Sequence, residues 1–181
     1  GLRNAVGLAF RPGTGELWAT VNGRDWLGDD RPAEYVTRVR PDGSYGWPYC
    51  HWTPSGLLPD PDLGSGDRCR DVARPDVLLQ AHTAPLGLAF YTGTQFPSEY
   101  RGNLFVALHG SWNRAVPVGY KVVRVRLGGG GPIVEDFVTG WLSGTRYWGR
   151  PVDLLMAPDG ALFLSDDSQG LVYRITYRAQ R

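Results

Sequence analysis

The 181-residue sequence predicts an all-β fold built from short antiparallel strands, and three observations favour it. The 25 glycines and 14 prolines alternate with short apolar runs, a composition typical of many strands joined by tight turns. The chain contains no long stretch with the apolar periodicity of a helix. One pattern, in which an apolar strand, a glycine-containing turn and a second apolar strand follow one another, occurs three times.

The three copies of this pattern have similar sequences. They are VGLAFRPGTGELWATV from Val6, LGLAFYTGTQFPSEYRGNLFVAL from Leu86 and VDLLMAPDGALFLSD from Val152. A further strand follows each copy, and in KVVRVRL and VYRITY apolar and polar residues alternate with a period of two, as in half-buried strands. Recurring antiparallel sheets with glycine-rich turns are typical of the four-stranded blades of a β-propeller. We therefore predict one domain over residues 1–181, with blade-like units at about residues 1–50, 80–130 and 133–181.

Three blades do not close a ring, because typical propellers have at least four. The sequence therefore predicts the C-terminal half of a larger propeller, and the alternative is that two copies of the chain associate to close it. The chain also begins with Gly1 and carries no signal-peptide pattern, so we expect either a processed protein or a fragment.

The charge and hydropathy of the chain argue against two classes of partner. The net charge is +1, and basic residues are scattered among acidic ones without a basic stripe, which argues against nucleic acid. No apolar run approaches the roughly 20 residues of a membrane-spanning helix. The sequence also lacks a phosphate loop, a dinucleotide-binding glycine pattern, an HExxH metalloprotease motif and a nucleophile-elbow serine.

The two cysteines, Cys50 and Cys69, flank a loop rich in proline, glycine and aspartate. Because such a loop has little apolar surface with which to order itself, we favour a disulfide between them, which would stabilise the fold by about 3 kcal/mol. Two buried free thiols are the alternative. A disulfide would indicate an oxidising compartment, the periplasm or the outside of the cell.

Polar residues gather where the apolar strands end. The segment VNGRDWLGDD follows the first return strand and contains more amide, glycine and charged residues than a turn requires. Comparable segments lie beside other strands. They contain His82 and Thr83; His109, Trp112, Asn113 and Arg114; and Arg146, Trp148 and Arg150. Arginine and histidine suit an anionic group, tryptophan suits stacking, and carbonyl and carboxylate oxygens suit a hard cation. Each residue taken singly has an ordinary interpretation as a loop or packing residue, and their recurrence at equivalent strand ends favours a site.

Several longer motifs resemble those of one enzyme family. GLRNAVGLAF, GSYGWPYC, AHTAPLGLAFY, YRGNLFVALHGSWNR, GYKVVRVRL and WGRPVDLLMAPDGALFLSDD are similar to segments of the glucose/sorbosone dehydrogenases. HGSWNR and HTAPLGLAFY are most similar to the L-sorbosone dehydrogenase-like branch. The resemblance covers nearly the whole chain. It implies a six-bladed β-propeller with pyrroloquinoline quinone (PQQ) on its axis, a calcium ion touching quinone and protein carbonyls, and sugar oxidation by hydride transfer to the quinone.

The resemblance also implies a set of site residues. Asn4 and Asn22 match side chains near the cofactor, and Gly23 and Arg24 match residues whose backbone carbonyls bind calcium. The other matches to cofactor-contacting positions are Asp29 or Asp30, His82 or Thr83, His109 and Arg150. The glucose-oxidising members have different residues at the positions of Asn22, Arg24, His109 and Trp148. Since the proton-abstracting histidine of the family lies upstream of the matching region, no catalytic residue is assigned within this chain.

We therefore expect the C-terminal half of a soluble, periplasmic or secreted PQQ- and calcium-dependent dehydrogenase of an aldose or sorbosone, with little activity on its own. Its expected partners are a small-molecule sugar and either the missing N-terminal half or a second copy, without nucleic acid or a membrane span. The departures at Asn22, His109 and Trp148 motivate an alternative from another class, a propeller binding module that has lost the cofactor. A calcium-dependent propeller lactonase is a third interpretation, which fits the carboxylates and histidines but not the family motifs.

Overall fold

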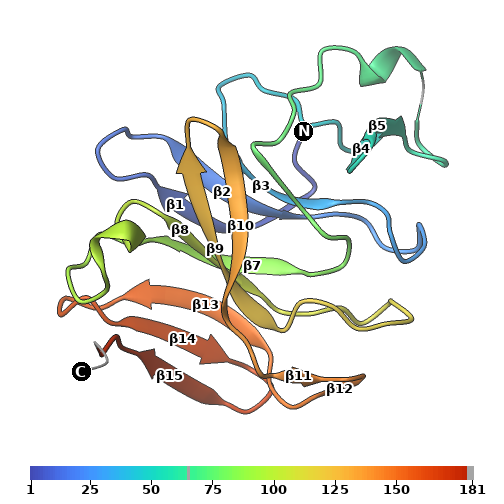
Figure 1. Cartoon of the computed structure of the whole chain (residues 1–181). Helices are drawn as coiled ribbons and strands as arrows, with labels where there is room; N and C mark the ends of the chain where they lie inside the picture. Colours follow the sequence, from blue (N-terminus) through green and yellow to red (C-terminus); the bar gives the residue numbers. More distant parts are fainter. Residues whose placement is uncertain (65, 179–181) are drawn as a thin grey trace.

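The computed structural model describes residues 1–64 and 66–178, which form β-strands joined by turns and loops (Figure 1). The helical segments in this range are two short 3-10 turns, η1 (Gly66–Cys69) and η2 (Ser98–Tyr100). In this part of the chain no helix has the length and apolar character needed to cross a membrane. The prediction of an all-β fold is confirmed.

Three antiparallel sheets lie in a row through the molecule (Figure 1). The strand order of the first is β1 (Asn4–Phe10), β2 (Leu17–Asn22), β3 (Glu34–Arg38) and β6 (Val77–Leu79). The second contains, in spatial order, β10 (Gly131–Val138), β9 (Lys121–Gly128), β8 (Leu104–Leu108) and β7 (Pro85–Phe90). The third contains β13 (Pro151–Met156), β14 (Leu162–Asp166) and β15 (Leu171–Ile175). Two hairpins pair β4 (Cys50–Thr53) with β5 (Gly56–Pro59) and β11 (Leu142–Ser143) with β12 (Arg146–Tyr147).

The repeated sequence pattern corresponds to the hairpins β1–β2, β7–β8 and β13–β14. Two outer strands do not coincide with the unit bounds expected from sequence. β6 completes the first sheet although it lies beyond residue 50, and residues 133–138 pair with β9 in the second sheet instead of opening the third unit. The second difference arises because the glycine-rich turn around Gly131, whose φ is +98°, returns the chain directly along β9.

The strands β1, β7 and β13 lie next to one another, and each has a shift of register near its start. Gly7 and Gly87 lie at two of these shifts and leave no room for a side chain. A Cβ on Gly7 would lie 2.3 Å from the carbonyl oxygen of Leu86, and a Cβ on Gly87 would lie 2.1 Å from Oδ1 of Asp153. The glycines of VGLAF and LGLAF therefore permit neighbouring sheets to approach closely. Thr20 strengthens the first contact, because its hydroxyl accepts from the Gly7 amide at 2.8 Å and donates to the Leu86 carbonyl at 2.5 Å.

Apolar side chains fill the space between adjacent sheets. The cluster between the first and second sheets includes Trp18, Val36, Leu88, Phe90 and Val106. The cluster between the second and third sheets includes Tyr91, Phe105, Trp141, Leu162 and Leu164. The second sheet is therefore covered on both of its faces, and β8 is buried along its whole length.

The first and third sheets carry exposed apolar side chains on the faces that point away from the second sheet. Leu8 and Phe10 of β1 are 61% and 69% exposed, and Leu155 and Val172 of the third sheet are 67% and 69% exposed. Large apolar side chains exposed on one face are a feature of interaction surfaces.

Cys50 and Cys69 form a disulfide, with their Cα atoms 5.8 Å apart, so this prediction is confirmed. The bond joins β4 to η1. The β4–β5 hairpin packs on the first sheet through Trp52, which belongs to one cluster with Tyr35 and Tyr45.

Candidate functional site

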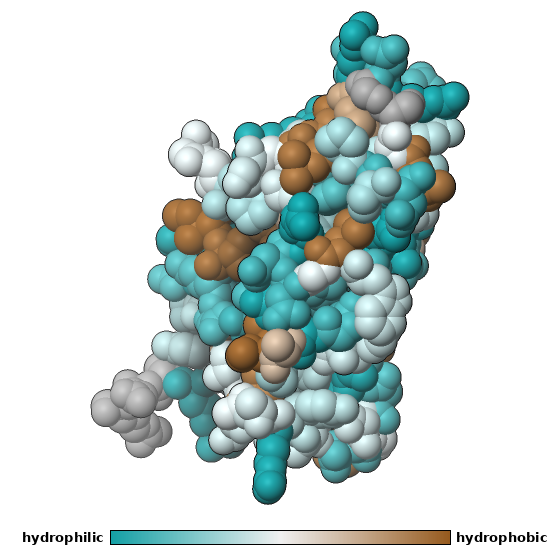
Figure 2. Space-filling view, turned by 90° about the vertical axis from the view of Figure 1, so that its right-hand side faces the viewer, coloured by the Kyte–Doolittle hydropathy of each residue, from teal (hydrophilic) through white to brown (hydrophobic). Residues whose placement is uncertain are grey.

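The loop that follows β2, the loop between β8 and β9 and the β11–β12 hairpin project toward the same side of the molecule, on the right in Figure 1. These segments contain many of the polar residues that the sequence analysis identifies as site candidates. Figure 2 views the molecule from this side and shows a largely hydrophilic or intermediate surface broken by separate hydrophobic patches.

A polar cavity of about 150 Å³ lies where the ends of the first and second sheets meet. The residues that line it come from the start of β1 and the end of β2, which lie side by side, from the start of β3, and from the loops before β7 and after β8. Their polar members include Arg3, Asn4, Asn22, Asp25, Glu34 and His82. Of the residues predicted from sequence, the structure brings together Asn4, Asn22, Gly23 and His82 here.

Two of these predicted residues also hold the cavity wall in place. Asn22 ends β2, is 9% exposed and donates a hydrogen bond of 2.8 Å from Nδ2 to the carbonyl of Pro85, at the start of β7. His82 has a φ of +66°, and its Nε2 lies 2.8 Å from the carbonyl oxygen of Gly28. Because a carbonyl only accepts hydrogen bonds, Nε2 is the protonated nitrogen of His82.

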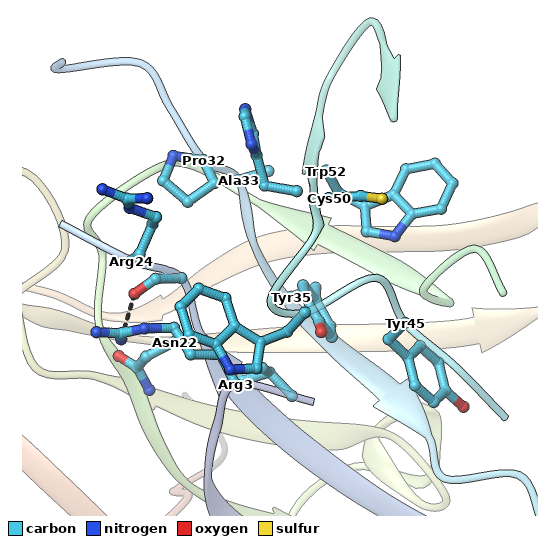
Figure 3. Close-up of a pocket in the computed structure, with 13 residues that line it drawn as sticks. Arg3, Asn22, Arg24, Pro32, Ala33, Tyr35, Tyr45, Cys50 and Trp52 are labelled. Atoms are coloured by element: carbon cyan, nitrogen blue, oxygen red, sulfur yellow. Dashed lines mark hydrogen bonds between the residues drawn. The ribbon is translucent and has the colours of Figure 1, made fainter. Parts of the chain in front are cut away.

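The carbonyl oxygen of Gly23, predicted as a calcium ligand, accepts a hydrogen bond of 2.5 Å from Nη1 of Arg3. Nη2 of Arg3 lies 4.0 Å from a carboxylate oxygen of Asp25, and its guanidinium lies over the ring of Trp47. Figure 3 draws this hydrogen bond as a dashed line, with Arg3 and Asn22 on a wall that the cavity shares with an adjacent, more apolar pocket. The carbonyl is therefore paired with a cationic side chain in this structure.

Glu34 is a buried carboxyl on the cavity wall that the sequence analysis does not identify. It is 5% exposed, and burial raises its pKa to about 8, while a backbone hydrogen bond from Ala84 opposes this rise. Its Oε2 has no hydrogen-bond partner among the described residues. Glu34 is therefore protonated at neutral pH and has a hydrogen-bonding oxygen free for a ligand.

Asn113 supplies a second unpartnered oxygen at the cavity. Its Nδ2 donates a hydrogen bond of 2.9 Å to Oδ1 of Asp25, whereas its own Oδ1 is buried without a partner in the described part of the chain. Arg3 and Asp25 were given no role from sequence, and Asn113 was named only as one polar residue of the segment that follows β8. Their only sequence signal was weak: each lies inside a family motif, GLRN, VNGRD or HGSWNR.

Much of the polar segment after β2 has a structural role. Asp29 accepts a hydrogen bond from the Ala115 amide at 3.1 Å, and its backbone carbonyl accepts one from Arg114. The Arg114 guanidinium also pairs with Asp30 at 3.0 Å. We refer to these contacts, together with the Asp25–Asn113 hydrogen bond, as the loop clasp between residues 25–30 and 113–115. The structure therefore places the Asp30 side chain, which is 87% exposed, in the clasp and not in the cavity.

Arg24 points its side chain away from the cavity. Its guanidinium forms salt bridges of 2.7 Å with both Asp60 and Asp62. Thr83 is 2% exposed and donates its hydroxyl to the carbonyl of Gln80 at 2.9 Å, within a turn. These two predicted residues therefore contribute to the loops around the cavity without lining it through their side chains.

His109 and Arg150 form a separate cluster between the second and third sheets. Nε2 of His109 lies 3.0 Å from the carboxylate of Asp167. Arg150 donates to the carbonyl of His109 at 3.3 Å and to that of Gly110 at 2.7 Å. Its guanidinium also lies 5.6 Å from the ring centre of Tyr147. This cluster joins two sheets and lies outside the lining of the cavity.

The chemistry of the cavity fits both an anionic quinone and a hard cation. No group of three or more His, Cys, Asp or Glu side chains within residues 1–64 and 66–178 is arranged to hold a metal ion. A cation would therefore require backbone and amide oxygens together with carboxylates, all of which calcium accepts. The Asp25 carboxylate and the unpartnered oxygen of Asn113 are such ligands, whereas the protonated Glu34 offers a hydrogen bond. The Arg3 guanidinium suits a carboxylate of the quinone.

A family model described as TrAA12-like matches residues 1–178. The chain is 34% identical over 185 residues to an uncharacterized protein of Borreliella burgdorferi, covering 98% of this chain and 48% of that protein. It is 31% identical over 227 residues to a pyrroloquinoline quinone-dependent pyranose dehydrogenase of Coprinopsis cinerea, covering 97% of this chain and 30% of the enzyme. The chain thus spans less than half the length of these two relatives.

Two solved structures have similar folds. The holo form of the PQQ domain of the Coprinopsis cinerea pyranose dehydrogenase has a TM-score of 0.71 and 26% identity, covering 97% of this chain and 54% of that domain. A calcium structure of a Trichoderma reesei carbohydrate-active enzyme of family AA12 has a TM-score of 0.77 and 24% identity, covering 94% of this chain and 51% of that chain. The second likeness shows similarity of fold.

Proposed function

Since the chain belongs to the TrAA12-like family, we propose that it is part of a sugar dehydrogenase that uses PQQ and calcium. The proposed substrate is an aldose or sorbosone, in keeping with the L-sorbosone-like motifs of the sequence. The observation that carries this proposal is the polar cavity at the sheet ends, which gathers Arg3, Asn4, Asn22 and His82. A relative that covers 97% of this chain is named as a PQQ-dependent pyranose dehydrogenase.

We assign the cavity residues distinct binding roles. The Arg3 guanidinium would bind a carboxylate of the quinone, and the Gly23 carbonyl would turn to calcium once Arg3 is engaged in this way. Asp25 and the unpartnered oxygen of Asn113 would supply further oxygen ligands or hydrogen-bond acceptors. Asn22 and His82, each fixed by a hydrogen bond to a backbone carbonyl, would keep the wall rigid.

Oxidation of the sugar removes a hydride from carbon, which the quinone accepts when bound, and a proton from oxygen, which requires a base. His82 matches a cofactor-contacting position of the family and not its proton-abstracting histidine, and the hydrogen bond from its Nε2–H to Gly28 leaves Nδ1 as its basic nitrogen. His109 is paired with Asp167 outside the cavity lining. We therefore propose that the base comes from protein outside these 181 residues and that the chain alone has little or no activity.

The exposed apolar faces of the first and third sheets support the same view. We propose that they pack against an N-terminal half of the protein, so that a six-bladed propeller closes around the cavity. Closure by a second copy of this chain is the alternative. The disulfide between Cys50 and Cys69 favours a periplasmic or secreted location.

The proposal is tested by titrating the full-length protein with PQQ at several calcium concentrations and then following the quinone absorbance as aldoses and sorbosone are added. Calcium-dependent binding followed by bleaching with one of these sugars would support the dehydrogenase and identify its substrate. Failure to bind PQQ at any calcium concentration would overturn it and favour a binding module that has lost the cofactor.

A further inference from the structure

Two large aromatic side chains lie exposed and in mutual contact beside the cavity. Trp26 is 77% exposed and Trp112 is 62% exposed, and their ring centres are 5.3 Å apart with the planes at 83°. Trp112 lines the cavity, and Trp26 packs edge-to-face against it. Single exposed apolar residues are ordinary, but a contacting pair of tryptophans at the rim of a polar cavity is a feature of binding surfaces.

The backbone at Trp26 is in a left-handed conformation, with a φ of +69°. This region is unfavourable for a bulky residue, and such strain clusters at ligand-binding positions. The loop clasp holds this conformation, because its contacts fix Asp25, Asp29 and Asp30, on either side of Trp26. The hydrogen bond between Asp25 and Asn113 joins the residues next to Trp26 and Trp112 in sequence, so the aromatic pair and the polar pair bridge the same two loops.

The two pairs together match the surface of a pyranose ring. A pyranose presents axial C–H groups on its faces and hydroxyl groups around its perimeter. The open face of an indole accepts the C–H groups, while carboxylate, amide and guanidinium groups bond the hydroxyls. Asp25, Asn113 and Arg3 supply such polar groups directly beside Trp112.

We propose that Trp26 and Trp112 form a subsite that stacks a second pyranose unit, so that the preferred substrate is an oligosaccharide longer than one sugar. This inference rests on the proposed sugar dehydrogenase function. It assigns to the two tryptophans the binding of a sugar unit other than the one that is oxidised. Trp26 does not line the cavity, so a sugar unit stacked on the exposed indoles lies outside it, beyond the reacting ring.

The test measures saccharide binding without PQQ, by intrinsic tryptophan fluorescence and by calorimetry, in the full-length protein. The probes are glucose and its β-1,4-linked dimer and trimer. We expect Trp112→Ala to weaken binding of the trimer by about five- to tenfold while changing glucose binding less than about twofold. Trp112→Phe, which keeps an aromatic face, is expected to restore much of the affinity, and Trp26→Ala to give a smaller loss than Trp112→Ala.

The matched control is Trp148→Ala, because Trp148 is also half-exposed on the same side but donates its indole N–H to the carbonyl of Gly140. Unchanged trimer affinity in both Trp26→Ala and Trp112→Ala would overturn the proposal. Poor quenching of both indoles by acrylamide in the full-length protein would overturn it too, since it would show that other protein covers them. A loss confined to reduction of a protein electron acceptor would overturn it in favour of an acceptor-docking role.

These outcomes separate the subsite from the dehydrogenase. If the trimer binds through the tryptophans but PQQ does not bind, the proposed function fails and the subsite stands. If PQQ binds and is reduced by sugar while the variants behave as the wild type, the subsite fails and the proposed function stands.

Discussion

The guanidinium of Arg3 donates a hydrogen bond of 2.5 Å to the carbonyl oxygen of Gly23. Arg3 precedes β1 and Gly23 follows β2, so the bond closes the cavity end of the first hairpin. A cation cannot share that oxygen with a guanidinium at close range, because the two positive charges repel. If the proposed calcium binds at Gly23, Arg3 must turn toward an anion, and this would couple binding of the metal to binding of the quinone.

Arg3→Ala is expected to lower PQQ affinity by about tenfold or more, because a charge-assisted hydrogen bond contributes about 1.5–3 kcal/mol. The measurement is a PQQ titration at saturating calcium. Arg40→Ala is the control, because Arg40 is exposed and its substitution removes the same charge from a distant loop. Equal PQQ affinity in the two variants would refute the role given to Arg3.

Glu34→Gln is expected to flatten the dependence of stability on pH. The pKa of Glu34 is about 8 in the folded state against an ordinary value of 4.5, so the folded protein holds this proton more tightly than the unfolded chain does. The free energy of unfolding should therefore fall as pH rises from about 4.5 to about 8 in the wild type. Urea denaturation at pH 5, 6, 7 and 8 measures this slope.

The exposed carboxyl of Asp42 provides the comparison for that experiment. Asp42→Asn should keep the slope of the wild type, whereas Glu34→Gln should reduce it. A slope that is the same in all three proteins would show that Glu34 is not neutral in the folded state.

Gly87→Ala is expected to destabilise the fold by about 1–3 kcal/mol, because the new Cβ would overlap the backbone and carboxylate of Asp153 on β13. Gly129→Ala is the matched control. A Cβ at Gly129 would meet nothing within 4 Å, so its effect should stay within about 0.5 kcal/mol. Thermal or urea unfolding of both variants checks the difference, and equal stabilities would contradict the close approach of β7 and β13.

Replacement of both cysteines, Cys50→Ser with Cys69→Ser, should lower the free energy of unfolding by about 3 kcal/mol. The loss should come chiefly from freeing the loop between β4 and η1 in the unfolded chain. Denaturation with and without reductant tests this, since reductant should destabilise the wild type and leave the double variant unchanged. Insensitivity of the wild type to reductant would argue against the bond.

The strands were predictable because their patterns are local. The three repeated hairpins follow from apolar runs separated by turn residues, and the glycines of VGLAF and LGLAF marked them as equivalent. The strands β6 and β10 were harder to assign to a sheet. β6 pairs with β3 and β10 pairs with β9, and the residues of β6 and β10 do not by themselves identify these partners. Sheet membership is a long-range property that short windows of sequence do not contain.

The candidate site was predictable only in part for the same reason. Asn4, Asn22, Gly23 and His82 lie near strand ends, where the fold itself brings them together. Glu34 was missed because it opens the strand EYVTR, in which polar and apolar residues are mixed, and because its burial depends on the sheets around it.

His109 and Arg150 were grouped with these residues by sequence, yet the conformations of their loops place them between the second and third sheets. Loop conformation of this kind is set by contacts with distant segments. The loop clasp shows the same dependence, because the partners of Asp29 and Asp30 are Arg114 and Ala115, in the loop between β8 and β9 of the second sheet.

The burial of the second sheet on both faces creates a gradient in how readily backbone amides open to solvent. The amide hydrogens of β8, which is buried along its whole length, should exchange with deuterium only through opening of the whole chain. Those of β1 and β15, which carry exposed apolar side chains, should exchange earlier through local opening. Protein packed against the outer sheets would slow exchange in β1 and β15 while leaving β8 unchanged, so exchange rates in these two strands would report on the proposed closure of the propeller.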